Sequence, residues 1–281
     1  MTGVKALVLT GYGLNCDYET AFSLEKAGAR THRVHINELI RVGNTAPVTR
    51  LEDFHILVFG GGFSWADDHG AGVLMASKMK NHLGDQIGRF IEDGKLVLGI
   101  CNGFQCLVNL GLVPGFDSDY GKRSVALTYN DSGNFIDDWV NLRVNPESPC
   151  VFTRGISTLE LPVRHGEGKF YAQDKDIDRL VKGGQVVLQY ADAQGNESGG
   201  RWPFNPNGSL RDIAGICDPS GRIFGLMPHP EAFNHFTNHP DWTWKRDSLA
   251  RQGGHMEDEE GKGIRIFRNA VEYICSSFHG I

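Results

Sequence analysis

Short apolar runs alternate with longer amphipathic stretches over the first hundred residues of the chain. Apolar runs bounded by glycine or polar residues predict buried strands, and apolar positions spaced three or four apart predict helices. The predicted strands are 4–10, 31–36, 54–59 and 95–100, and the predicted helices are 18–27 and 73–93. Strands that alternate with helices predict a mostly parallel sheet with helices on both faces, which is an α/β fold.

After Leu110 the pattern changes to β-rich segments separated by Gly, Pro, Asn and Asp. The predicted strands are 124–129, 139–144, 158–163, 185–190, 213–217 and 222–226. Such strands are typical of mixed or antiparallel pairing, so we expect them to extend the same sheet. We expect an irregular excursion over about 232–262 and a last helix over 264–277. Without an internal repeat or a low-complexity linker, the pattern favours a single domain over residues 1–281.

Composition narrows the class of protein and its partners. Apolar residues make up 40% and charged residues 22% of the chain, as in ordinary globular proteins. The formal charge of −6 disfavours nucleic acid and membrane surfaces as partners. No apolar run approaches the ~20 residues that span a bilayer, and the start predicts a strand and turn, so we expect a cytoplasmic protein. The six cysteines form no C-x-x-C pair, which favours reduced thiols.

The segment GICNG at 99–103 follows a predicted buried strand and opens a helical stretch. This is the G-x-nucleophile-x-G elbow, with Cys101 in the place of serine. Glycines are needed there because the nucleophile occupies a strained, tightly packed turn, and a helix N-terminus behind the sulfur favours the reactive thiolate. The alternative is a structural thiol that happens to lie between two glycines. Strand, elbow and helix together favour a nucleophile.

Attack by a thiolate on an amide also requires donors for the developing oxyanion. Elbow enzymes take one N–H from the residue after the nucleophile, which is Asn102 here, and one from another strand-end loop. The triple glycine 60–62, directly after the predicted strand 54–59, is the natural source of the second N–H. Standing alone, these glycines would indicate a flexible turn equally well.

The leaving ammonia must be protonated, so a histidine oriented by a carboxylate is expected near the sulfur. His229 and Glu231 lie two residues apart in MPHPE, at the end of the predicted strand 222–226. In an extended segment, residues i and i+2 project to the same side, so Glu231 can orient His229. On spacing alone, His229 is only one candidate among eleven histidines.

A group of histidines toward the end of the chain suggests a metal site only weakly. Those in or near the predicted excursion are His229, His235, His239 and His255. Without a cysteine or a tight ligand spacing among them, a solvated loop is favoured and no metal is predicted. The chain also has no G-x-x-x-x-G-K-[ST] loop, so we expect no cofactor in it.

Several segments along nearly the whole chain carry a resemblance to a known family. They are NCDYET at 15–20, FGGGFSWADD at 59–68, LGICNGFQCL at 98–107, VNLRV at 140–144, RHGEGKF at 164–170, PFNPNGS at 203–209 and IAGICDPSGRIFGLMPHPE at 213–231. GICNGFQ and MPHPE are typical of class I glutamine amidotransferases. PFNPNGS and HGEGKF narrow the resemblance to the glutaminase subunits of phosphoribosylformylglycinamidine synthase.

The resemblance implies a flavodoxin-like sheet with an antiparallel extension, and it assigns roles to the matching residues. The implied roles are nucleophile Cys101, acid/base His229 and its partner Glu231, oxyanion donors Gly62 and Asn102, and glutamine-binding Gln105, His165 and Gly166. The last three rest on the resemblance alone. The family hydrolyses L-glutamine through a γ-glutamyl thioester. It passes ammonia to a synthetase subunit, which uses ATP and Mg to convert formylglycinamide ribonucleotide to formylglycinamidine ribonucleotide in purine biosynthesis. A small accessory subunit is a further candidate partner.

Two departures from the family pattern are visible, and two other hypotheses stay open. Ala232 stands where the family usually has arginine, and the excursion over 232–262 lengthens the chain. One alternative is a stand-alone cysteine hydrolase or redox sensor that shares the elbow, but such proteases commonly have a histidine at the position of Asn102. The other is a non-catalytic scaffold subunit, which an intact Cys101, His229 and Glu231 disfavour.

Overall fold

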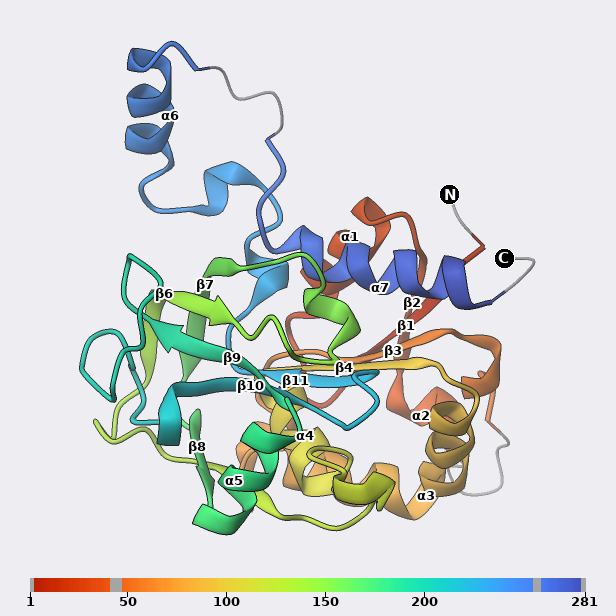
Figure 1. The fold of residues 1–281 in the computed structure, drawn as a ribbon. Coiled ribbons are helices and arrows are strands. Elements are labelled where there is room, and N and C mark those ends of the chain that lie inside the picture. The colour runs from red at the N-terminus through yellow and green to blue at the C-terminus, as the bar shows by residue number, and fades with distance from the viewer. Residues whose placement is uncertain (1–2, 41–46, 255–258, 279–281) are drawn as a thin grey trace.

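The computed structural model describes residues 3–40, 47–254 and 259–278. Its centre is a nine-stranded sheet in the order β2-β1-β3-β4-β11-β10-β9-β6-β7 (Figure 1). The strands of this sheet are β1 (Lys5–Thr10), β2 (Arg30–His35), β3 (Ile56–Phe59), β4 (Leu96–Ile100), β6 (Ile136–Val144), β7 (Thr158–His165), β9 (Val186–Ala191), β10 (Ile213–Cys217) and β11 (Ile223–Leu226). The fold is the predicted α/β architecture.

The sheet has a parallel half and an antiparallel half. Strands β2, β1, β3, β4 and β11 pair in parallel, and β11, β10, β9, β6 and β7 pair antiparallel. Every residue of β3 and β4 is buried, because strands in a parallel sheet are covered on both faces. The carboxyl ends of β3, β4 and β11 therefore meet at one edge, which is where the elbow, the triple glycine and MPHPE begin.

Helices cover both faces of the sheet. The α-helices of the described residues are α1 (Asp17–Lys26), α2 (Ile36–Leu39), α3 (Val73–Glu92), α4 (Asn102–Leu110), α5 (Asp174–Lys182), α6 (Trp242–Arg251) and α7 (Ile264–Ser277). In Figure 1, α1 and α7 lie on one side of the sheet, and α3, α4 and α5 lie on the other. Among the described residues, no helix is long and apolar enough to cross a membrane.

The prediction for 124–129 is right about the strand and wrong about its partner. This segment forms β5 (Val125–Thr128), which pairs with β8 (Lys169–Ala172) in a separate two-stranded sheet. Neither β8 nor α5 was predicted. β8 is four residues long, and α5 buries only Ile177 and Leu180, so neither has enough apolar positions to reveal its period. The single domain over 1–281 stays a prediction.

The segment 232–262 is not irregular throughout, because it contains α6, which stands apart from the sheet in Figure 1. No residue of α6 is buried, so its sequence lacks the apolar stripe that marks a packed helix. The segment before α6 is anchored on β7, where His239 Nε2 lies 2.9 Å from Glu160 Oε1. His239 therefore helps to hold this segment against β7. His255 lies outside the described residues.

Candidate active site

Cys101 occupies a strained turn between β4 and α4. Its φ of 51° and ψ of −108° lie in a region that residues with a side chain rarely adopt. The Cys101 N–H donates to the Leu226 carbonyl at 2.8 Å, and the Cys101 carbonyl accepts from Gln105 N–H at 3.1 Å, so both neighbouring elements hold the turn. The sulfur lies at the N-terminus of α4, 3.6 Å from the Arg164 carbonyl oxygen.

The glycines on either side of Cys101 are required by close packing. A Cβ on Gly103 would lie 1.9 Å from the Phe59 carbonyl oxygen, and one on Gly99 would lie 2.6 Å from the Leu107 side chain. Real Cβ atoms do not approach other atoms so closely. The glycines therefore let α4 sit directly against β3 and β4, with its first turn behind the sulfur.

His229 and Glu231 form a buried pair in the segment after β11. The His229 N–H donates to the Pro162 carbonyl at 2.8 Å, which ties the segment to β7. His229 Nδ1 lies 2.6 Å from Glu231 Oε1, and the side chains are 2% and 0% exposed. Because Nδ1 faces the carboxylate, Nε2 is the ring nitrogen left for a reacting group, and it has no hydrogen-bond partner among the described residues.

The charges around His229 favour its protonated form. Burial lowers the pKa of His229, but the Glu231 carboxylate and the nearby Cys101 sulfur together raise it well above its ordinary value. The nearby Cys16 thiol contributes in the same direction. His229 can therefore take the proton of the Cys101 thiol, and Glu231 balances the resulting positive charge.

Cys16 is a second thiol at this site that the sequence did not single out. Its sulfur and ligand atoms of His229 and Glu231 all lie within 4.8 Å of one another. Among the described residues, this group has the spacing to hold a metal ion. Glu231 already pairs with His229, so the spacing is explained by that contact. Burial raises the pKa of the Cys16 thiol. Cys16 therefore stays a neutral thiol, whereas Cys101 is the thiol at the elbow.

The glycine run that was expected to supply an oxyanion donor is tied to the turn before α1. The Gly61 carbonyl accepts from the N–H groups of Asn15 and Cys16, both at 3.3 Å, and Phe63 N–H donates to the Gly13 carbonyl at 2.9 Å. The C=O of Gly61 and the N–H of Gly62 belong to one trans peptide plane and point in opposite directions. These bonds therefore fix the direction of the Gly62 N–H, although glycine peptides alone turn easily.

Gln105 lies in the first turn of α4 and bonds to neighbouring loops. Its Nε2 donates to the Glu167 carbonyl, and its Oε1 accepts from Asn102 Nδ2 at 3.3 Å. Gln105 is 4% exposed, which differs from the helix-surface amide that its position alone suggests. The structure therefore places it between the elbow and the loop after β7.

His165 is held by Asn130, a residue that the sequence did not single out. Its Nδ1 lies 3.1 Å from Asn130 Oδ1, and Asn130 N–H donates to the Gly166 carbonyl at 2.9 Å. Burial, with a smaller contribution from His229, lowers the pKa of His165 to about 3, so the ring is neutral. Gly168 N–H also donates to Asn130 Oδ1, so this oxygen is an acceptor and His165 carries its proton on Nδ1. The buried Nε2 is then a free acceptor among the described residues.

Comparison with known proteins identifies the family of the chain. The family model for the CobB/CobQ-like glutamine amidotransferase domain matches residues 3–274. Phosphoribosylformylglycinamidine synthase subunit PurQ of Methanococcus maripaludis is 46% identical over 269 residues, which cover 96% of this chain and 97% of that protein. The PurQ subunit of Dehalococcoides mccartyi is 46% identical over 97% of this chain and 98% of its own. The chain belongs to the PurQ family of glutamine amidotransferases.

Solved structures agree with the assignment to the PurQ family. A chain of the PurLQS structure from Thermotoga maritima superposes with a TM-score of 0.68 at 27% identity, and the match covers 97% of this chain and 100% of that one. A glutamine amidotransferase from the same organism, at 15% identity and a TM-score of 0.51, shares the fold. Because the M. maripaludis relative is matched over nearly its full length, the added length of this chain is shared with that relative.

The two segments that narrowed the resemblance to this family form one hydrogen-bonded unit. Asn207 of PFNPNGS donates through Nδ2 to the Gly168 carbonyl of HGEGKF at 2.9 Å. Ser209 Oγ donates to Asn207 Oδ1 at 2.7 Å and accepts from Phe170 N–H at 2.9 Å. PFNPNGS therefore supports the loop that carries His165. The only sequence signal for this unit is the Asn, Pro and Gly content of both segments.

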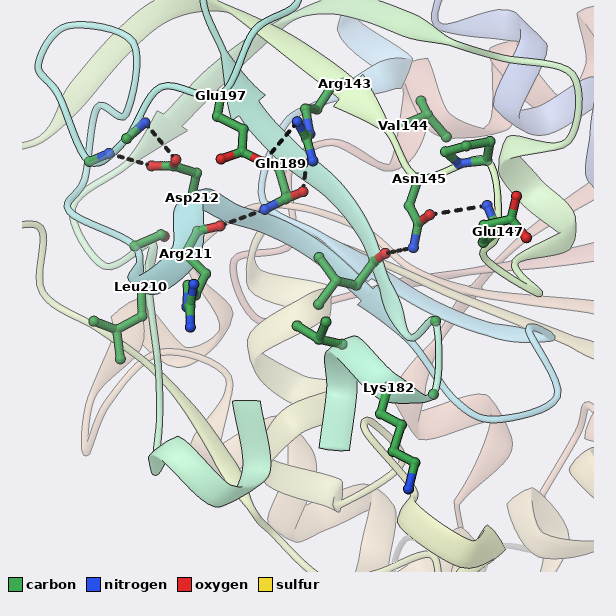
Figure 2. Close-up of a pocket in the computed structure, with 18 of the residues that line it drawn as sticks. Arg143, Val144, Asn145, Glu147, Lys182, Gln189, Glu197, Leu210, Arg211 and Asp212 are labelled. Atoms are coloured by element: carbon green, nitrogen blue, oxygen red, sulfur yellow. Dashed lines mark hydrogen bonds and ion pairs between the residues drawn. The ribbon is translucent and has the colours of Figure 1, made fainter. Parts of the chain in front are cut away.

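A hollow of about 1240 Å³ lies in the antiparallel half of the sheet, and none of the predicted site residues lines it. Figure 2 shows side chains that line this hollow. Asp212 accepts there from the N–H groups of Gly199 and Gly200, and Gln189 joins Arg143 to the Arg211 carbonyl (Figure 2). These polar groups satisfy one another, so they stabilise the loops. The catalytic prediction stays with the residues around Cys101.

Proposed function

We propose that this chain is the glutaminase subunit of a phosphoribosylformylglycinamidine synthase and that Cys101, His229 and Glu231 are its catalytic triad. The observation that carries the proposal is the buried His229–Glu231 pair beside a cysteine at the elbow. Membership of the PurQ family favours this function over a stand-alone hydrolase, a redox sensor or a non-catalytic scaffold.

The first half of the proposed reaction forms a thioester and releases ammonia. His229 Nε2 takes the Cys101 proton, and the thiolate attacks the side-chain amide carbon of L-glutamine. The N–H groups of Gly62 and Asn102 stabilise the oxyanion of the tetrahedral intermediate. His229 then gives its proton to the amide nitrogen, the carbon–nitrogen bond breaks, and ammonia leaves a γ-glutamyl thioester on the enzyme.

Water completes the cycle. His229 takes a proton from the water, the hydroxide attacks the thioester carbon, and the carbon–sulfur bond breaks to release glutamate. The Cys101 thiolate then takes the proton back from His229. Glu231 accepts the hydrogen bond from Nδ1 and holds the ring so that Nε2 faces the reacting atoms. Gln105, neutral His165 and Gly166 bind glutamine in this scheme. Their support is that Gln105 and His165 are buried beside the elbow and that His165 has a free acceptor nitrogen.

The ammonia serves a synthetase partner of the PurL type, which is named with PurQ in the PurLQS complex of Thermotoga maritima. We expect this partner to use ATP and Mg for the conversion of formylglycinamide ribonucleotide to formylglycinamidine ribonucleotide, and to bring in the small accessory subunit. The chain itself requires no cofactor in this proposal. All six cysteines are unpaired, which suits the reducing cytoplasm where we place the complex.

The experiment that tests this function compares glutamate release by the isolated chain and by the reconstituted complex, at equal concentration of this chain. We expect co-purification with the synthetase, slow hydrolysis by the free chain, and a substantially higher rate with the nucleotide-loaded partner, because docking can adjust the glycine run and the turn bonded to it. Equal rates would contradict control by the partner. Failure of the complex to make product from glutamine would overturn the function.

A further inference from the structure

Two carboxylates flank the first turn of α4, and the reaction described above uses neither. Asp67 follows the glycine run, and its Oδ1 accepts from Asn102 Nδ2 at 2.8 Å. Glu167 follows His165 in the loop after β7, and its main-chain carbonyl accepts from Gln105 Nε2. Burial, and then the charge of Glu167, raise the pKa of Asp67 to about 6. The charges of the two side chains therefore disfavour each other.

No ion pair of the described residues compensates this repulsion. Within residues 3–40, 47–254 and 259–278, the ion pairs include neither Asp67 nor Glu167. Both side chains are half-buried, so water screens them only in part. Half-buried like charges without a partner are costly for the fold, which is an arrangement typical of functional sites.

Asn102 supplies an independent sign that a ligand belongs here. It is 1% exposed, and its Oδ1 has no hydrogen-bond partner among the described residues. Its Nδ2 donates to both Asp67 and Gln105 Oε1, so the amide cannot be turned over without losing both bonds. A buried acceptor without a donor is disfavoured unless something donates to it. The free Oδ1 belongs to the same amide that Asp67 holds.

The backbone fixes Asp67 in this position. Trp65, Ala66 and Asp67 have φ values of 52°, 55° and 55°, a left-handed run without glycine. The Trp65 ring stacks on Tyr12 with ring centroids 4.3 Å apart, and Trp65 N–H donates to the Tyr12 carbonyl at 2.6 Å. Such strained conformations persist only where the surroundings impose them. The result is a carboxylate held rigidly against the start of α4.

A ligand that suits these groups is positively charged and carries several N–H donors. Asp67, Glu167 and the Asn102 oxygen are all acceptors, and a primary ammonium group has three donors and no acceptor. Cys101 is the residue before Asn102, so its sulfur lies near these acceptors. A molecule that contacts both the sulfur and the acceptors therefore carries its ammonium group a short chain away from the carbon that the sulfur attacks. The α-amino acid L-glutamine has this shape.

We propose that Asp67, with Glu167 and the Asn102 side-chain oxygen, binds the α-ammonium group of L-glutamine and makes the site select α-amino acid amides over simple primary amides. This inference rests on the proposed glutaminase function. The contact is made in the bound substrate and in the transition state alike, because the α-ammonium group takes no part in the reaction. Uniform binding of this kind changes KM and leaves kcat nearly unchanged.

The test compares L-glutamine with glutaramate, the same γ-amide without the α-amino group, as substrates of the assembled complex. Asp67→Asn removes the charge but keeps the oxygen that bonds Asn102, and asparagine tolerates the left-handed backbone. We expect KM for L-glutamine to rise about 10- to 100-fold, as for a lost hydrogen bond to a charged group, with kcat within about threefold. The kcat/KM for glutaramate should stay unchanged, so the preference for glutamine collapses.

Asp68→Asn is the matched control. Asp68 is the adjacent carboxylate, and its side chain is 73% exposed. Among the described residues it bonds only to its neighbour His69, so both substrates should behave as with the wild type. A fall in kcat for both substrates in Asp67→Asn would overturn the inference, because it would show that Asp67 acts through Asn102 on the oxyanion. An unchanged preference for glutamine would overturn it as well. A wild-type complex that releases no glutamate would instead overturn the proposed function and this inference with it.

Discussion

Replacing Asp67 by asparagine should stabilise the free chain at neutral pH, although we expect it to weaken substrate binding. The pKa of Asp67 is raised from 3.8 to about 6, first by burial and then by Glu167, against a hydrogen bond from Asn102. At pH 7 the charged form of this carboxylate therefore lowers the stability of the folded chain. Asparagine carries no charge and keeps the oxygen that accepts from Asn102 Nδ2.

The size of the effect follows from that change in pKa. At about 1.4 kcal/mol for each tenfold change in proton affinity, the full cost of ionising Asp67 is roughly 3 kcal/mol. Solvent screens a half-buried group, so we expect about half of it, ~1–2 kcal/mol. The unfolding entropy of a chain of this length is about 0.6 kcal/mol/K, from ~2.1 cal/mol/K per residue. The Tm of Asp67→Asn should therefore exceed that of the wild type by about 2–3 °C.

Thermal unfolding of both proteins between pH 4 and pH 8 checks the sign. Because the folded pKa is raised, the favourable contribution of protonated Asp67 is present below pH 3.8 and is lost as the pH rises through about 6. The difference in Tm should therefore be largest above pH 7 and should nearly vanish at pH 4. A lower Tm for the variant at pH 7.5, or a difference that does not depend on pH, would refute the reasoning.

Two further substitutions test the geometry around His229. Glu231→Gln should lower the rate of glutamine hydrolysis roughly 10³- to 10⁴-fold with the fold retained, because a neutral amide cannot stabilise the imidazolium. Near wild-type turnover would show that another group orients the His229 ring. Gly61→Ala should lower kcat at least about tenfold, because its Cβ would lie 2.7 Å from His229 Cε1. Gly88→Ala on α3, where a Cβ meets nothing within 4 Å, is the control and should keep full activity; equal activity of both variants would contradict the steric argument.

The fold was predictable where the hydrophobic pattern was strong. The parallel half of the sheet follows from apolar runs such as β3 and β4. These strands are buried on both faces, so their sequences are recognisable as buried strands. β5 was placed in the wrong sheet because its pairing with β8 depends on contacts between distant segments, and a strand pattern specifies no partner. α6 was missed because a helix that buries no residue shows no apolar period.

The local geometry of the candidate site was predictable where a short motif marks it. The strained turn at Cys101 is marked by the glycines on either side of it, and the contact between His229 and Glu231 follows from residues i and i+2 projecting to the same side. Asp67 and Asn130 were not found, because each reaches the site from a loop distant in sequence and no local rule marks such a contact. The partner of a buried polar atom becomes visible only when the fold is known.

The most direct test of the central claim is synthesis by a complex that carries Cys101→Ala. Only the production of ammonia requires the thiolate, so we expect no synthesis of formylglycinamidine ribonucleotide from glutamine, and synthesis from added ammonium salt at the wild-type rate. Both reactions are measured on the same preparation, with ATP and formylglycinamide ribonucleotide present. Loss of both activities would contradict the account, because it would make Cys101 a structural residue of the complex, and retention of the glutamine reaction would show that Cys101 is not the nucleophile.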